Sequence, residues 1–150
     1  MTSVPCSVKG VFVVLSPAGT MPVVLLTDGS ARLLPIFIGF AEAVSIKSAM
    51  NREVLPRPFT HDLFIETFEK FGIRITSLQI DTINNGVYYA QLVLSHDHQE
   101  ARIDCRPSDG IALALRAGAP VYVEQEVLDN AGQEGSNLPP LVDLETFLKQ

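Results

Sequence analysis

The stretch IDCRPSDGIALALRAGAP, residues 103–120, contains the end of one structural element, a turn and the whole of the next element. Pro107 is suited to the first turn of a helix because its fixed φ is already helical. Gly118 and Pro120 are typical of a helix end. Between them the alanines and leucines make the helix apolar nearly all round, which predicts burial on more than one side, as at a subunit interface. We therefore expect a strand ending near Cys105 and a buried helix after it.

A similar succession occurs earlier in the chain. Residues 8–16, 21–27 and 31–38 are rich in β-branched and aliphatic residues, and an alanine-rich helical segment, FAEAVSIKSAM, follows them. Residues 73–83, 87–95 and 101–105 are the corresponding strands ahead of the second helix. The sequence predicts an α+β fold with a mainly antiparallel sheet and a possible internal duplication of a β-β-β-α unit.

A further helix is expected between these two units. Thr60 is a suitable N-cap, and Gly72 is placed to end the helix in the left-handed conformation. Phe64, Phe68 and Phe71 recur at helical spacing and predict one buried stripe.

The chain after this second unit divides at Gly132. We expect residues 1–132 to form the main domain and residues 133–150 to contain a flexible linker and a C-terminal helix that packs on it.

Composition restricts the classes of function. The 150 residues include 17 acidic and 11 basic side chains, for a net charge of −6, and the scattered bases argue against tight, non-specific binding of duplex nucleic acid. Two cysteines without a CxxC motif argue against structural zinc. The short apolar runs predict no membrane partner, and the absence of an export signal predicts a cytoplasmic protein.

The quoted stretch contains the first group of chemically useful residues. Ser108 could simply cap the helix, and Asp109 could stabilise the helix dipole from the first turn. That structural interpretation leaves Asp104 and Arg106 without a role, although Asp104 could pair with Arg102 on a solvated strand. Both interpretations remain open on the sequence alone.

A second group lies at the start of the predicted middle helix, in RPFTHDLFIE. Asp62 and Glu66 are four residues apart and share a helical face, where two carboxylates could bind a divalent cation or could simply be solvated. His61 is adjacent to them. Glu42 occupies, in the first helix, the place that Asp109 occupies in the later one, so a pair of acids at two helix starts could line one cleft.

Four segments together resemble the bifunctional nuclease domain family: LPIFIGFAEAVSIKSAM, RPFTHDLFIETFEKFGIRI, NNGVYYAQLVL and IDCRPSDGIALALRAGAPVYVEQEVLDNAG. The resemblance extends from Val8 to Gly132. It implies a compact α+β domain that self-associates, and a nuclease activity on RNA and DNA.

This resemblance motivates a specific hypothesis for the site. Glu42, Asp62, Asp104 and Asp109 would bind one or two Mg²⁺ or Mn²⁺ ions, which would activate water and stabilise charge on the phosphodiester. Arg106 and Arg57 would bind the phosphate, and His61 would transfer a proton. The catalytic set is then His61, Asp104, Arg106 and Asp109.

A different class of function explains the same motifs. They could build a non-enzymatic, oligomeric binding or regulatory module. In either case we expect a homo-oligomer, most simply a dimer, and single-stranded nucleic acid is the expected partner of the enzyme.

Overall fold

The computed structural model describes residues 2–150 and contains two β-β-β-α units, as the sequence predicts. The first consists of β1 (Ser3–Ser16), β2 (Gly19–Thr27), β3 (Arg32–Phe37) and α1 (Phe40–Met50). The second consists of β4 (Arg74–Asn84), β5 (Val87–His96), β6 (Gln99–Cys105) and α3 (Pro107–Ala117), and α2 (Thr60–Lys70) precedes it. Short elements complete the chain: β7 (Val121–Glu124), α4 (Gln125–Ala131), β8 (Gln133–Glu134), η1 (Gly135–Asn137), β9 (Leu141–Asp143) and α5 (Leu144–Leu148).

The strands form one sheet in the order β6-β5-β4-β7-β1-β2-β3-β8, and β9 pairs with β1. All neighbours are antiparallel except β4 and β7. β1 joins the two halves, because its residues 3–6 pair with β7 and its residues 7–16 pair with β2. The fold is therefore α+β with a mainly antiparallel sheet, whereas the duplication stays a prediction.

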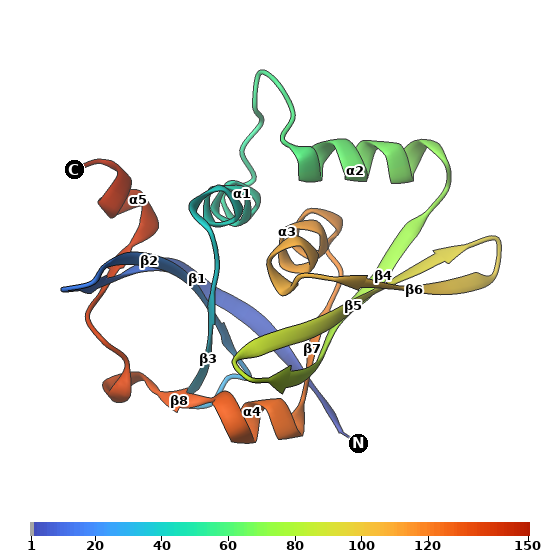
Figure 1. Cartoon of the computed structure of the whole chain (residues 1–150). Helices are drawn as coiled ribbons and strands as arrows, with labels where there is room; N and C mark the ends of the chain where they lie inside the picture. The colour runs from blue at the N-terminus through green and yellow to red at the C-terminus, as the bar shows by residue number, and fades with distance from the viewer. Residues whose placement is uncertain (1) are drawn as a thin grey trace.

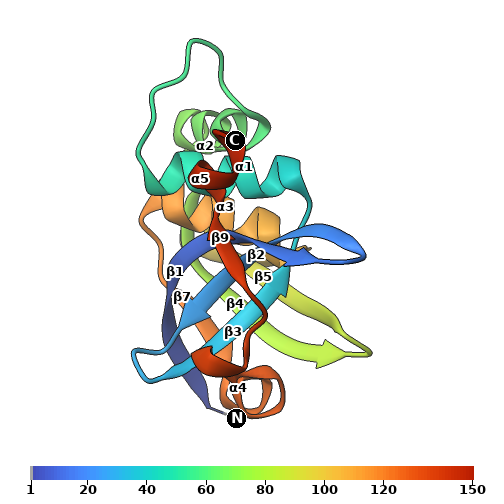
Figure 2. The ribbon, with the colours of Figure 1, turned by 90° about the vertical axis from the view of Figure 1, so that its left-hand side faces the viewer.

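The helices form layers on the sheet (Figure 1). α1 contacts β1 and β2, α3 contacts β4 and β5, and the two helices contact each other. α2 packs on α3 and forms the outermost layer, while α4 covers β3, β4 and β7 at the opposite end of the molecule (Figure 2). Among residues 2–150 no helix is both long and apolar enough to cross a bilayer.

The core explains why α3 is apolar nearly all round. Four consecutive residues of α3 are buried within one chain, between the sheet and the helices α1 and α2: Ile111, Ala112, Leu113 and Ala114. Helix and sheet approach closely at Gly110, where a Cβ would overlap the buried side chain of Leu78. A subunit interface is therefore not needed to cover α3.

The predicted phenylalanine stripe of α2 is wrong. Phe64 is 47% exposed and Phe71 is 70% exposed, and no residue of the helix is fully buried. The inward side consists of His61, Asp62, Ile65 and Phe68, which are half-buried. α2 therefore attaches to the domain through few apolar contacts and through polar ones. The left-handed Gly72, with φ of 71°, follows the end of α2 as predicted.

Two predicted caps are also wrong by one or two positions. The N-cap of α2 is Phe59, whose N–H donates to the Asp62 carboxylate at 2.9 Å, and Thr60 is the first helical residue. The N-cap of α3 is Arg106, so Ser108 lies inside the helix and is buried. Pro107 occupies the first helical position, where a backbone N–H would have no partner within the helix. Because proline has no N–H, this position needs no capping side chain.

The segment expected to be a flexible linker is partly ordered by the sheet. Gln133 and Glu134 pair with β3 as β8, and residues 141–143 pair with β1 as β9. The C-terminal helix α5 then buries Leu144 completely and stacks Phe147 on Phe40 of α1, with ring centroids 5.9 Å apart. α5 thus packs on the domain beside α1.

Candidate functional site

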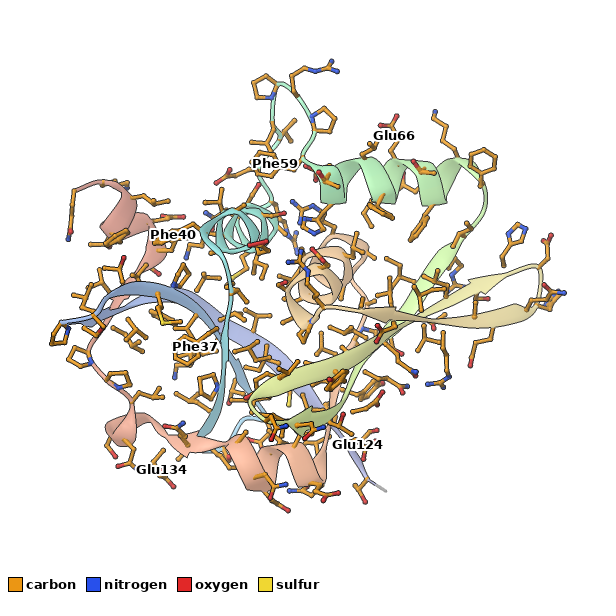
Figure 3. All side chains as sticks on the ribbon, viewed as in Figure 1. Phe37, Phe40, Phe59, Glu66, Glu124 and Glu134 are labelled. Atoms are coloured by element: carbon orange, nitrogen blue, oxygen red, sulfur yellow. The ribbon has the colours of Figure 1, made fainter. Side chains whose placement is uncertain are left out.

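Three helices begin around one pocket of about 600 Å³, which we call the His61 pocket. Its walls come from the first turns of α1 and α2, from the start of α3 and from Leu148 of α5. The aromatic residues Phe40 and Phe59 lie on the side of the sheet that α1, α2 and α3 cover (Figure 3). The pocket is lined by Phe40, Ala41, Glu42, Val44, Ser45, Phe59, Thr60, His61, Arg106, Asp109 and Leu148.

The charged residues of this pocket and His61 all belong to helix starts. Glu42 lies in the first turn of α1, His61 in that of α2 and Asp109 in that of α3, while Arg106 immediately precedes α3. Helix N-termini carry partial positive charge and unpaired N–H groups, so they stabilise carboxylates and also favour a bound anion. The fold therefore directs three such termini at one space.

A hydrogen-bonded row of side chains crosses the pocket wall. His61 Nε2 lies 2.9 Å from Asp109 Oδ1. Arg106 Nε donates to the other oxygen of Asp109 at 2.9 Å, and Nη2 forms an ion pair with the same oxygen at 2.8 Å. Arg106 Nη1 donates to Glu42 Oε1 at 3.4 Å. These contacts raise the pKa of the Arg106 guanidinium, chiefly through the hydrogen bond to Asp109. The side chain is nevertheless 65% exposed, so it is accessible to a ligand.

A second ion pair lies behind this row. Arg116 of α3 donates from Nε to Asp62 Oδ1 at 2.7 Å, and its side chain is only 8% exposed. Burial tends to raise the pKa of Asp62, but the hydrogen bonds from Arg116 and from the Phe59 N–H outweigh burial and lower it. Asp62 is therefore an ionised anchor between α2 and α3.

Sequence analysis missed two residues of this network, Ser45 and Arg116. Arg116 also donates from Nη2 to Ser45 Oγ at 3.1 Å, and Ser45 in turn contacts His61. The available signal was weak: Ser45 is a polar residue on the buried side of an alanine-rich helix, and Arg116 ends an otherwise apolar one.

The structure brings together only part of the predicted site. His61, Arg106 and Asp109 of the catalytic set share the His61 pocket with Glu42, whereas Asp104 lies on the exposed strand β6 opposite Gln91. Arg57, expected to bind phosphate, is exposed in the loop between α1 and α2 and does not line the pocket.

The four predicted metal ligands do not form one site. Glu42 and Asp109 both contact Arg106, Asp62 contacts Arg116, and Asp104 lies apart. Glu66 projects from the outer side of α2 (Figure 3), and neither Glu66 nor Asp62 lines the His61 pocket. Within residues 2–150 no group of three or more His, Cys, Asp or Glu side chains is arranged to hold a metal ion. Because guanidinium groups contact Glu42, Asp62 and Asp109, and Asp104 lies apart, the four residues do not fit one carboxylate metal centre in this arrangement.

The pocket lies within the part of the chain that matches a protein family. A family model described as the bifunctional nuclease domain matches residues 23–136, which include every pocket residue except Leu148. The chain belongs to the bifunctional nuclease domain family.

Several relatives share this region. An uncharacterized protein of Mycobacterium tuberculosis is 38% identical over 112 residues, which are 74% of this chain and 66% of the relative. Bifunctional nuclease 1 of Oryza sativa subsp. japonica is 27% identical over 113 residues, covering 73% and 34% of the two chains. Bifunctional nuclease 1 of Arabidopsis thaliana is 29% identical over 106 residues, covering 69% and 33%. The chain thus spans slightly under two thirds of the mycobacterial relative and about a third of the plant ones.

Proposed function

We propose that this chain is a nuclease that hydrolyses phosphodiester bonds of single-stranded RNA and DNA in the His61 pocket. The observation that carries the proposal is the row His61–Asp109–Arg106, which places a proton carrier and a guanidinium on one wall of a pocket in a nuclease-family domain. Membership of the family supplies the class of reaction. The row supplies groups able to perform it.

The roles follow from the chemistry of each group. Arg106 has five N–H donors, and within residues 2–150 its hydrogen bonds to carboxylates use one on Nε and one on Nη1, so N–H groups remain for phosphate oxygens. Asp109 orients His61 through the 2.9 Å contact with Nε2, which suits His61 to accept and return a proton. Three helix N-termini offset part of the negative charge of Glu42 and Asp109.

The surroundings favour a flexible, single-stranded substrate. A neighbouring hollow of about 510 Å³ shares Glu42 and Arg106 with the His61 pocket, so a phosphate at Arg106 would have space on both sides. Phe40 and Phe59 line one hollow, and Phe37 and Tyr88 line the other. Aromatic side chains bind unpaired bases by stacking, which favours a single-stranded substrate over a duplex.

The test is cleavage of 5′-labelled single-stranded RNA and DNA by purified protein. We expect His61→Ala and Asp109→Asn to lose at least about 100-fold in rate, because general acid–base catalysis contributes on the order of 10²–10⁴. Glu69→Gln, an exposed carboxylate on the outer part of α2, is the matched control and should keep the wild-type rate. Cleavage that persists unchanged in His61→Ala would refute the proposal.

The same assay tests the metal requirement expected from the sequence. Reactions in chelator, in Mg²⁺ and in Mn²⁺ are compared for the wild type and for Asp104→Asn. Cleavage in chelator would support the arrangement seen here, in which arginines neutralise the carboxylates. Strict metal dependence combined with loss of activity in Asp104→Asn would instead support the four-carboxylate site.

The alternative, an oligomeric binding module, is favoured by a different surface. Leu63 and Phe64 of α2 and Phe71 at its C-cap are exposed large hydrophobic residues. Exposed apolar side chains that gather into a patch are typical of interaction sites. Binding of oligonucleotides without cleavage, together with a dimer in light scattering that Phe64→Ser and Phe71→Ser dissociate, would favour the module.

A further inference from the structure

Ser45 belongs to a row of hydrogen-bonded side chains. Neither the family match nor the sequence motifs assign a role to this serine. Its Oγ lies 2.6 Å from His61 Nδ1, and His61 Nε2 lies 2.9 Å from Asp109 Oδ1. The three residues come from α1, α2 and α3. Ser45 is only 4% exposed, but it lines the His61 pocket, so the pocket is its access to a ligand.

The direction of these hydrogen bonds follows from Arg116. A guanidinium can only donate, so the contact of 3.1 Å between Arg116 Nη2 and Ser45 Oγ uses a lone pair of the serine oxygen. The hydroxyl proton of Ser45 is then free to be donated to His61 Nδ1. Asp109 Oδ1 accepts the proton on Nε2, which assigns neutral His61 to the tautomer with a basic Nδ1.

This is the arrangement of an activated nucleophile. A serine is a weak nucleophile until a neighbouring base removes its proton, and the base is effective when a third group orients it. Serine, histidine and aspartate do this on unrelated folds, so the constellation is recognised by geometry and roles and not by chain order. Here Asp109 is itself fixed by Arg106, which contacts its second oxygen at 2.8 Å. The imidazole nitrogens are used in the opposite sense from the protease triad, which leaves the proton path intact.

We propose that Ser45 is the nucleophile of the hydrolytic reaction in the His61 pocket, an inference that takes its substrate from the proposed function. Ser45 Oγ attacks phosphorus while its proton passes to His61 Nδ1. The bond from phosphorus to the leaving oxygen breaks, and that oxygen takes the proton from His61. Water then gives a proton to His61 and attacks phosphorus, and Ser45 Oγ leaves and recovers the proton. One water is consumed, and the products are an alcohol and a phosphate monoester.

This chemistry has a consequence for substrate choice. Because the attacking oxygen comes from the protein, cleavage does not need the 2′-hydroxyl of RNA. We expect DNA and 2′-O-methyl RNA to be cleaved at rates within about tenfold of RNA of the same sequence. An enzyme that used the 2′-hydroxyl as nucleophile would cleave neither.

The direct test is covalent labelling with a fluorophosphonate, whose phosphorus accepts the serine oxygen as fluoride leaves. We expect one adduct, located on Ser45 by peptide mass spectrometry, and none there in Ser45→Ala. His61→Ala should label at least about 100-fold more slowly. Ser48→Ala is the matched control, because Ser48 lies one turn later on α1, is equally buried and lines a different pocket. Failure of the wild type to label at Ser45 would overturn the proposal.

A second variant keeps the test meaningful if Ser45→Ala unfolds, since that change removes the Ser45 acceptor of Arg116 Nη2. Ser45→Cys retains a nucleophilic atom beside His61, and we expect its new thiol to react rapidly with iodoacetamide near neutral pH. The native thiols are a built-in reference, because burial raises the pKa of Cys6 and Cys105 to about 11. A new thiol no faster than these two would contradict the inference.

The outcomes also separate this inference from the nuclease proposal. Labelling of Ser45 in a protein that cleaves no nucleic acid would support the nucleophile and refute the nuclease. Cleavage that is lost in His61→Ala but unchanged in a folded Ser45→Ala would support the nuclease and overturn the nucleophile.

Discussion

The attachment of α2 to the rest of the domain depends on the ion pair between Arg116 and Asp62. α2 has no fully buried residue, so apolar packing holds it only through half-buried side chains. Arg116→Ala removes the 2.7 Å bond to Asp62 and the 3.1 Å bond to Ser45. We therefore expect this substitution to destabilise the whole domain and to loosen α2 most.

The magnitude follows from the individual contacts. A hydrogen bond to a charged group contributes about 1.5–3 kcal/mol, and the guanidinium donates both of the lost bonds. Asp62 is 35% exposed, so water partly replaces its lost partner, and we take the lower end of the range, about 1.5 kcal/mol, for each bond. Arg116→Ala should therefore lower the free energy of unfolding by about 3 kcal/mol, which corresponds to roughly 6–12 °C in Tm for a domain of this size.

The measurement is a double-mutant cycle in urea. Arg116→Ala, Asp62→Asn and the double variant are compared, and we expect a coupling free energy of about 1–2 kcal/mol between the two positions. Arg57→Ala, which removes an exposed arginine from the loop before α2, is the control and should change stability by less than about 0.5 kcal/mol. Hydrogen exchange should show loss of protection in α2 ahead of α3. A coupling near zero would refute the role assigned to the pair.

The same pair predicts a pH dependence. The pKa of Asp62 is lower in the folded protein than in the unfolded chain, so its contribution to stability is complete above about pH 4. That contribution disappears as the pH falls through the lowered folded pKa. The difference in free energy of unfolding between the wild type and Asp62→Asn should therefore shrink on acidification and stay constant from about pH 5 to 8.

Three further substitutions or titrations test the packing. Gly110→Ala should lower the free energy of unfolding by about 1–3 kcal/mol, because the added methyl group overlaps the buried Leu78 side chain of the strand beneath α3. Equal stability of the two proteins in urea unfolding would contradict this close approach. Tyr88→Phe should lower the free energy of unfolding by about 1 kcal/mol, because it loses the 2.9 Å hydrogen bond to the Pro35 carbonyl. In the wild type, burial raises the pKa of Tyr88 to about 12, so its ultraviolet titration should have a midpoint near that pH. An ordinary midpoint of about 10 would argue against burial. Cys6 and Cys105 should react slowly with Ellman's reagent at pH 8, because burial raises the pKa of both thiols to about 11. Both should react rapidly after unfolding. Rapid reaction in the folded protein would show that the thiols are accessible.

Much of the architecture could be predicted because each element has a local signal. α1 and α3 begin and end where their alanine-rich composition and the flanking glycine and proline residues place them. Runs of β-branched residues locate the strands of both units. The signal failed at α2, where two different stripes satisfy helical spacing. The phenylalanine stripe is the more apolar, but α3 presents Arg116, so the side of α2 that carries Asp62 turns inward. Only the neighbouring helix decides between them.

The candidate site was predictable in part for a related reason. Helix starts are visible in sequence, and Glu42, His61, Arg106 and Asp109 all belong to helix starts that converge. Asp104 misled because its distance from the pocket depends on the register and exposure of β6, which no local pattern fixes. Three of the four carboxylates expected to bind metal contact arginines instead. Which partner a carboxylate contacts likewise depends on residues far apart in the chain.

Strand β1 belongs to both halves of the sheet, and this dictates how the protein can be made. Ser3–Cys6 find their partners only in β7, so translation must pass residue 124 before the beginning of the chain can take its final place. Until then one edge of the nascent sheet is open to chaperones or to other copies. A fragment that holds only one half would leave part of β1 or its partners unpaired, so we expect a split-protein design to regain its shape only when both pieces are supplied together.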